Sequence, residues 1–581
     1  MFKKALLATA LFALTHNSHA QFSQTVFFGD SLTDSGYYRP ITSALYPISG
    51  TFTTNPDPMW SQVLATHLGT QANPNGNGQT GTNYAIGGAR VTTDTTNTDL
   101  GIPISVPSAN SQIQNYLTHN TIDPNALYTV WIGANDLLNT SSSTEVIKAA
   151  QDTAGLVNDL RHAGATYVLV PNLPDIGLTP RATTAGISTA ATAAANLYNN
   201  TLYQSLQQSG ANVIPLDTFS LLQEVAKNPA SFGFSNITDT ACAGSSLVCA
   251  KNASTDGYLF ADGIHPTGQA HQAIGDYAYS VLQAPQQIGH ISQRLTAQHA
   301  GNNRLFQRLN SQDSSQSHVW ATGTLQSHDS GLSKTDNSDH GVRVGADFSQ
   351  GNYTLGAYLN YDAQSANWQN AGGSFDVDKM GLGVYHQGRF GKVRLNTGLG
   401  MDKLSIDTQR QVALGLATRQ HSAKASGHHA YADVQVGYDM GKVLPYVGLN
   451  WQHVKIGQLV EDQHNLSTSM QFDKHTYRQA YAKAGVQVNY PISDMLMVGG
   501  ALGLNHRLMD DEQNISGRLQ SVSANHFSLP VHDNSKKTAA ELSLFVNTKL
   551  KGLDLHAGLS GQFADSDNQN IAGQIGISKS F

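Results

Sequence analysis

The chain has 581 residues, a formal net charge of −7 at pH 7 and charged side chains at 13 % of its positions. This length excludes a single ordinary domain. Residues 21–285 contain 7 Lys and Arg against 17 Asp and Glu, whereas residues 286–581 contain 25 against 24. The acidic first half argues against nucleic-acid binding, and the change in charge balance indicates a domain boundary near residue 285.

The first 20 residues have the features of a secretory signal peptide. Lys3 and Lys4 precede an apolar run over residues 5–14, and the small-x-small sequence "SHA" ends just before Gln21. The apolar run is too short to span a bilayer. We therefore expect a mature chain that begins at Gln21 and leaves the cytoplasm.

The first half of the chain alternates strand-like and helix-like segments. The strand-like runs are residues 25–29, 128–133, 166–172 and 212–216, and the helix-like runs lie around residues 143–163 and 186–209. This rhythm predicts βαβ units and a parallel sheet flanked by helices. In such folds ligands bind at the carboxyl ends of the strands, so polar residues just after strands are candidates for a site.

Five such residues have the chemistry of a serine hydrolase. Ser31 follows the first strand in "FFGDSL", Gly88 ends "NYAIGG", Asn135 lies in "WIGAND", and Asp262 and His265 lie three apart in "DGIHPT". Nucleophilic catalysis by serine requires a base, a group that orients the base, and donors for the oxyanion. The alternative is that each is an ordinary turn residue, as Gly-Asp-Ser often is.

These four blocks, in this order, resemble those of the GDSL or SGNH hydrolase family over residues 25 to about 280. The resemblance implies a flavodoxin-like α/β fold and hydrolysis of carboxylic esters, often lipids, without a metal or cofactor. It assigns Ser31 as the nucleophile, His265 as the base and Asp262 as the orienting carboxylate. Gly88 and Asn135 would hold the oxyanion, with Gly87 as a second register for the glycine.

The chain contains only two cysteines, Cys242 and Cys249. In an oxidising compartment we expect them to form a local disulfide, worth about 2–3 kcal/mol in the chain-entropy model. Two thiols without neighbouring histidines do not predict a zinc site.

Residues 286–310 lack proline and predict a helix about 37 Å long, which is sufficient to cross a bilayer. The segment carries Arg294, Arg304 and Arg308, and these side chains could not face lipid without a large cost. We therefore expect the helix to lie in a polar lumen.

From about residue 315 onward, apolar and polar residues alternate with period two. Val342, Val344 and Phe348, for example, alternate with Arg343 and Asp347. Repeated segments with one apolar face are typical of a transmembrane β-barrel, whereas a soluble all-β domain would expose a large apolar surface. Twelve antiparallel strands are predicted, starting near residues 318, 341, 353, 376, 393, 428, 444, 477, 495, 537, 553 and 570. Short links alternate with long polar ones, the latter at residues 408–427, 457–476 and 509–535.

A signal peptide, an N-terminal domain, a lumenal helix and a C-terminal twelve-stranded barrel together resemble a classical autotransporter. The expected domains are a signal peptide (1–20), a hydrolase passenger (21–285), a lumenal helix and linker (286–314) and a barrel (315–581). The chain ends on an aromatic residue, Phe581, which resembles the recognition signal of outer-membrane proteins. The resemblance implies the outer membrane and the barrel-assembly machinery as partners, and a passenger exposed at the cell surface.

The expected function is therefore a surface-displayed esterase or lipase, with phospholipids among the candidate substrates. Two alternatives remain open at this point: a surface adhesin or binding module, and a polysaccharide deacetylase.

Overall fold

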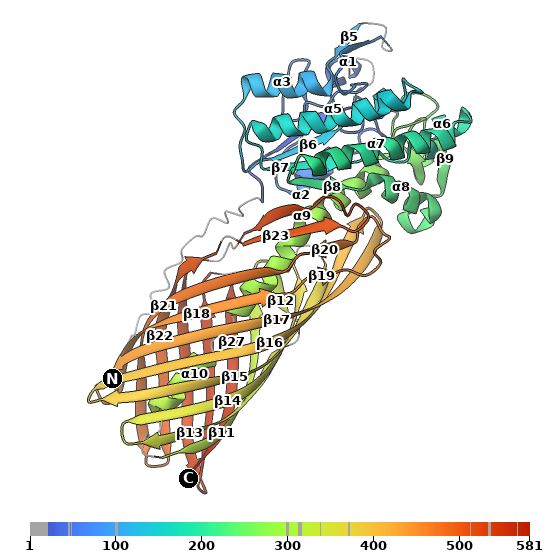
Figure 1. Cartoon of the computed structure of the whole chain (residues 1–581). Coiled ribbons are helices and arrows are strands. Elements are labelled where there is room, and N and C mark those ends of the chain that lie inside the picture. The colour runs from blue at the N-terminus through green and yellow to red at the C-terminus, as the bar shows by residue number, and fades with distance from the viewer. Residues whose placement is uncertain are drawn as a thin grey trace, which may run out of the picture.

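The computed structural model describes residues 21–43, 47, 49–98, 103–297, 301–311, 316–336, 338–369, 372–511, 513–532, 536–565 and 568–581. The signal peptide predicted for residues 1–20 lies outside these residues, as do residues 298–300 and 312–314 of the predicted lumenal helix and linker (286–314). In Figure 1 the N-terminal domain, coloured blue to green, lies at one end of a barrel coloured yellow to red.

A four-stranded parallel sheet forms the centre of the N-terminal domain. Its strands are β1 (Thr25–Gly29), β6 (Leu127–Trp131), β7 (Tyr167–Pro171) and β8 (Val213–Leu216), in the order β1-β6-β7-β8. Nearly every residue of these strands is buried, as expected for a parallel sheet covered on both faces. The predicted α/β fold is confirmed, and the strands that precede Ser31 and Asn135 are direct neighbours.

Helices pack around this sheet. They are α1 (Arg39–Thr42), α2 (Trp60–His67), α3 (Ala109–His119), α4 (Ala134–Leu137), α5 (Ser143–His162), α6 (Pro180–Thr184), α7 (Ser188–Gln208) and α8 (Thr218–Lys227). The sequence explains α5 well: the Ser142 hydroxyl accepts the N–H of Glu145, and Val146, Ala150 and Val157 form one buried face. The short strands of the domain are β2 (Asn75–Gly76), β3 (Gln79–Thr80), β4 (Thr95–Asn97), β5 (Ile104–Val106), β9 (Asn236–Thr240) and β10 (Tyr258–Phe260).

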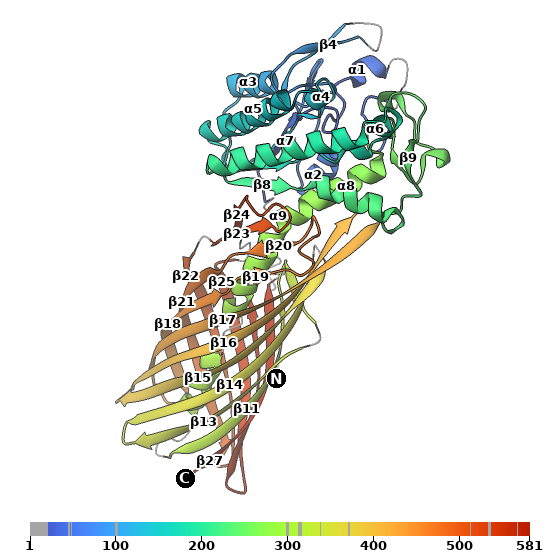
Figure 2. The same ribbon diagram turned by 45° about the vertical axis from the view of Figure 1, so that its right-hand side comes forward.

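One long helix, α9 (Gly268–Ala297), connects the two halves of the molecule. It starts in the N-terminal domain and continues past Pro285 into the barrel lumen, where α10 (Gly301–Ser311) follows (Figures 1 and 2). The domain boundary expected between residues 285 and 286 therefore lies inside a helix. The segment predicted as one lumenal helix, residues 286–310, is the second part of α9 together with α10. Among the described residues, no helix is both long enough and apolar enough to cross a bilayer.

The barrel has twelve main strands and is closed because its last strand pairs with its first. They are β11 (His318–Asp329), β13 (Asp339–Gln350), β14 (Tyr353–Trp368), β15 (Gly373–Phe390), β16 (Val393–Leu414), β17 (Ala417–Tyr438), β18 (Val443–Ile456), β21 (His475–Ser493), β22 (Leu496–Asp510), β25 (Thr538–Leu550), β26 (Leu553–Phe563) and β27 (Gln569–Ser580). A short β12 (Ser333–Thr335) pairs with β11 and β14. The predicted twelve-stranded antiparallel barrel is confirmed.

Side chains on the two barrel faces differ as a membrane protein requires. Val342, Leu355 and Leu542 are exposed on the outer face, which would contact lipid. Inside, Arg294 of α9 forms an ion pair with Asp339, and Arg308 of α10 forms one with Asp347. Both arginines are buried against lumenal acceptors rather than lipid, as expected from their charge.

The predicted loops need correction. Residues 408–427 are not a loop, because β16 extends to Leu414 and β17 begins at Ala417, with only Gly415 and Leu416 between them. The other two long links contain β19 (Leu459–Val460), β20 (Met470–Phe472), β23 (Gln513–Leu519) and β24 (Phe527–Val531), which form a second sheet. The second sheet buries one apolar face, which includes Met470, Phe472, Ile515 and Leu529, but its strands are too short to show the long alternation of a strand that crosses the membrane.

Candidate active site

The structure brings Ser31, His265 and Asp262 into one hydrogen-bonded line. The Ser31 Oγ lies 2.8 Å from His265 Nε2, and His265 Nδ1 lies 2.8 Å from Asp262 Oδ2. Ser31 lies in the turn after β1, whereas Asp262 and His265 lie in the loop after β10, and His265 is 234 positions later in the chain than Ser31. With Nδ1–H donating to the carboxylate, Nε2 can accept the serine proton, which is the arrangement that a serine nucleophile requires.

The Asp262 side chain also shapes the loop that carries His265. Its Oδ1 accepts the backbone N–H groups of Ile264 and His265. Burial alone would raise the pKa of Asp262, but the nearby His265 and the N–H donors outweigh it and hold this pKa below its usual value. Asp262 is therefore a carboxylate at neutral pH and can orient and stabilise a charged imidazole.

Ser246 contacts both Asp262 and His265 and was not singled out from the sequence. Its backbone N–H donates to Asp262 Oδ2 over 2.8 Å, and its Oγ lies 3.1 Å from His265 Nδ1. In the structure Cys242 and Cys249 form a disulfide that encloses Ser246 in a small loop. In the sequence, only the two cysteines on either side of Ser246 indicate that its loop is held in place. A serine in a loop does not by itself predict a contact with Asp262 or His265.

The residues expected to hold the oxyanion lie near each other, and one of them, Asn135, lines the same cavity as Ser31. Asn135 follows β6 and donates from Nδ2 to the Ala89 carbonyl, one residue beyond Gly88. The Gly87 N–H donates to Asp34 Oδ2, whereas no partner of the Gly88 N–H is found among the described residues. This difference favours Gly88 over Gly87 as the oxyanion donor. Gly88 has φ +87°, a conformation that glycine adopts without strain.

Asp34 is a second residue that the sequence analysis did not single out. It is fully buried and accepts the backbone N–H groups of Gly36, Tyr37 and Gly87, so it ties the serine loop to the glycine turn. Burial raises its pKa to about 6 despite these bonds. Asp34 lies in the same "GDSLTD" block as Ser31, but only the fold reveals its contact with Gly87.

Asp30 precedes the serine and gives the site a testable pH dependence. Burial raises its pKa to about 7, although the Leu32 N–H and the nearby His265 oppose this rise. In the unfolded chain an Asp ionises near pH 4, so the folded state alone keeps this proton between about pH 4 and pH 7. The stabilisation from this proton is complete below about pH 4 and is lost as the pH rises through about 7.

We expect Asp30→Asn, which stays neutral, to remove this dependence. Between about pH 4 and pH 7, the free energy of unfolding of wild type should fall relative to that of the variant by up to about 1.4 kcal/mol per pH unit. Thermal unfolding followed by tryptophan fluorescence at several pH values measures the difference. Parallel unfolding temperatures for the two proteins across this range would show that Asp30 does not titrate there.

A small apolar cavity adjoins the serine. It has a volume of about 90 Å³ and is lined by Ser31, Asn135 and His265 together with mostly apolar side chains. Trp131 also lines it, whereas the nearby aromatic residues Tyr37, Tyr38 and Trp60 are buried in the core. An apolar pocket beside a nucleophile suits a hydrocarbon chain more than a polar group.

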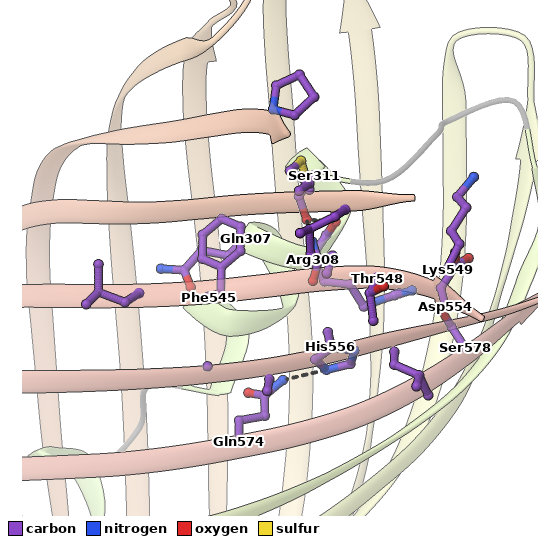
Figure 3. Close-up of a pocket in the computed structure, with 18 of the residues that line it drawn as sticks. Gln307, Arg308, Ser311, Phe545, Thr548, Lys549, Asp554, His556, Gln574 and Ser578 are labelled. Carbon is purple, nitrogen blue, oxygen red and sulfur yellow. Dashed lines mark hydrogen bonds between the residues drawn. The ribbon is translucent and has the colours of Figure 1, made fainter. Parts of the chain in front are cut away.

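A larger cavity, about 520 Å³, lies in the barrel near the end that carries the C-terminus. Figure 3 shows its polar lining, in which Gln307, Arg308 and Ser311 come from α10 and His556 accepts a hydrogen bond from Gln574. The smaller cavity, in contrast, is lined by a serine and a histidine that are hydrogen-bonded to each other, Ser31 and His265. Of the two cavities, the smaller one therefore has the chemistry of an active site.

Comparison with known families agrees with both halves of this structure. Residues 25–278 match the family model described as GDSL-like Lipase/Acylhydrolase, and residues 319–560 match the one described as Autotransporter beta-domain. The chain is an autotransporter with a GDSL-type serine esterase or lipase domain. Its barrel makes it a protein of the outer membrane.

Relatives of this autotransporter share both parts. It is 24 % identical to Lipase 1 of Photorhabdus luminescens over 679 aligned positions, which cover 100 % of this chain and 99 % of the relative. It is 26 % identical to Esterase EstA of Pseudomonas aeruginosa over 630 positions, which cover 93 % and 94 %. Among solved structures, the translocator domain of NalP from Neisseria meningitidis aligns with a TM-score of 0.40 at 16 % identity, covering 50 % of this chain and 98 % of that one.

Proposed function

We propose that Ser31, His265 and Asp262 act as a catalytic triad that hydrolyses carboxylic esters through an acyl-enzyme. The observation that carries this proposal is the 2.8 Å contact between Ser31 Oγ and His265 Nε2 at the mouth of an apolar cavity. His265 takes the serine proton as Oγ attacks the ester carbonyl, and it then returns the proton to the leaving alcohol. Water, activated by the same imidazole, releases the acid and restores the serine.

The oxyanion in this mechanism would be held by the backbone N–H groups of Ser31 and Gly88 and by the side-chain amide of Asn135. The second hydrogen of the Asn135 amide remains available, because only one is needed for the bond to Ala89. Such donors act on charge that develops in the transition state, and the protein holds them in place beforehand.

The substrate class that fits this cavity is an ester with a hydrocarbon acyl chain, as in a lipid or phospholipid. A polysaccharide deacetylase handles only an acetyl group and has no use for the apolar wall formed by Leu221, Leu222, Val225, Phe234 and Leu259. An adhesin would leave the hydrogen-bonded triad without a role.

We also propose that the N-terminal domain is exposed at the cell surface. It lies at the end of the barrel opposite the C-terminus (Figure 2), and the strand links at the C-terminal end, residues 351–352, 391–392, 439–442, 494–495 and 551–552, are all short. Short turns face the periplasm in outer-membrane barrels, so the opposite end faces outward. On this proposal the barrel-assembly machinery recognises the last strand, β27, which ends just before Phe581 and closes the barrel on β11.

Intact cells allow both proposals to be tested together. A serine-reactive fluorophosphonate probe that cannot cross the outer membrane should label the full-length protein on whole cells and should spare Ser31→Ala. Purified protein should cleave p-nitrophenyl octanoate with a higher kcat/KM than p-nitrophenyl acetate. Labelling only after cell lysis would refute surface exposure, and a preference for the acetyl ester would refute the acyl-chain assignment.

A further inference from the structure

The apolar cavity lies between two helices, and both of them contact the barrel. The lining residues from these helices are Leu221, Leu222 and Val225 of α8 and Ala270, Ala273 and Ile274 of α9. Near the cavity, the barrel contacts these helices through the end of the β16–β17 hairpin and through the segment around Ser467, between β19 and β20. The cavity walls are thus not supported by the N-terminal domain alone.

Glu224 attaches α8 to the barrel. It lies on the helix between the lining residues Leu222 and Val225, and its Oε2 is 2.6 Å from Nη2 of Arg419 on β17. Its two carboxylate oxygens also accept the backbone N–H and the hydroxyl of Ser467, over 2.7 Å and 2.9 Å. The Arg419 and Glu224 side chains are only 13 % and 15 % exposed, so these charge-assisted bonds are largely shielded from water and strong.

The same barrel elements hold α9. The Gly415 N–H at the hairpin tip donates to Asp276, and the Tyr277 hydroxyl donates to the Ser467 carbonyl over 2.6 Å. The Arg419 guanidinium also lies 5.4 Å from the centre of the Phe232 ring, two residues before Phe234 of the cavity wall. Ser467 therefore bonds to both helices, and Arg419 joins α8 to the segment that follows it.

We infer that the barrel sets the acyl-chain selectivity of the enzyme: Arg419 and Ser467 are positioning residues that fix α8, through Glu224, at the correct distance from α9. The inference rests on the proposed acyl-ester function. An apolar pocket discriminates between chains by close fit, and one methylene is worth about tenfold or more in kcat/KM when the walls are fixed. A wall released from its support loses this fit, whereas Ser31 and His265, on other segments, keep their geometry.

The test uses the full-length protein in detergent and compares octanoyl with acetyl p-nitrophenyl esters. We expect Glu224→Gln and Arg419→Ala each to lower kcat/KM for the octanoyl ester by about tenfold, mainly through a higher KM, and to change the acetyl ester by less than about twofold. The double variant should lose no more octanoyl-ester activity than either single variant, because both substitutions remove the same ion pair between Glu224 and Arg419. Should Arg419→Ala not fold, Arg419→Lys, which keeps the charge but loses the planar fork, should shift selectivity in the same direction by less.

Asn212→Ala is a matched control. Asn212 exchanges two hydrogen bonds with the backbone of Ser528 on β24, so it also joins the N-terminal domain to the barrel, but it does not line the cavity. The ratio of kcat/KM for the octanoyl ester to that for the acetyl ester should be the same in Asn212→Ala as in wild type. Equal losses on both esters in the Glu224 and Arg419 variants, or unchanged selectivity, would overturn the inference while the proposed function stands. Wild type that prefers acetyl esters would instead refute the proposed acyl-chain function itself.

Discussion

Replacing Ser31 by alanine should lower kcat for ester hydrolysis by about 10⁴-fold or more while leaving the protein folded in the outer membrane. The reason is chemical: alanine has no oxygen to form the acyl-enzyme, and the 2.8 Å bond to His265 is the one side-chain hydrogen bond of Ser31 among the described residues. Hydrolysis of p-nitrophenyl octanoate by purified protein measures the loss. Heat-modifiable migration on gels reports whether the barrel is intact.

His265→Ala should cost about as much as Ser31→Ala, and the double variant should be no worse, because residues that act as one unit are not additive. Asp262→Ala should retain more activity. Ser246 Oγ lies 3.1 Å from His265 Nδ1 and can still hold the imidazole in place. Near-normal turnover in Ser31→Ala, or additive losses in the double variant, would contradict a shared catalytic role.

The second large effect is expected at Asn135. Its amide would donate to the oxygen of the ester carbonyl as that oxygen becomes negative, so it stabilises the transition state more than bound substrate. Removing one such donor typically costs about 10²–10³ in kcat, roughly 3–4 kcal/mol. Asn135→Ala should therefore lower kcat by about this factor and leave KM nearly unchanged. Steady-state kinetics on a soluble ester separates the two constants.

Asn135→Asp makes the same test sharper. A carboxylate is nearly the same size as the amide but repels a developing oxyanion, so this variant should be slower than Asn135→Ala. A raised KM with an intact kcat in Asn135→Ala would instead make Asn135 a substrate-binding residue. The oxyanion role would then fall to the backbone N–H groups of Ser31 and Gly88.

Local patterns in the sequence were enough for the architecture and for the candidate residues. Period-two alternation predicts a strand wherever one face meets lipid and the other a polar lumen, and the twelve predicted starts all fall at or close to observed strands. Short polar residues directly after buried strands marked Ser31 and Asn135, because parallel strands present their carboxyl ends at one edge. Both signals depend only on neighbouring residues in the chain.

The tertiary structure decided what depends on contacts between distant residues. Asp34 is joined to the Gly87 N–H, and Ser246 to Asp262 and His265, yet in sequence each is one more polar residue in a turn. The continuation of α9 past Pro285 also escaped prediction, because proline favours a helix end unless the surrounding structure holds the helix together. Here α9 is enclosed by the barrel, where Arg294 pairs with Asp339.

The contact between the N-terminal domain and the barrel likewise depends partly on local sequence and partly on tertiary structure. The sequence by itself determined a hydrolase fold, a barrel and the residue types of a serine-based site, since each follows from periodicity or from a short motif. Only the tertiary structure decided that β16 and β17 extend beyond the membrane band and that Arg419 meets Glu224 there. Polar strands and polar loops have the same composition, and an ion pair between residues 195 positions apart leaves no local pattern; its geometry exists only once both chain segments have folded.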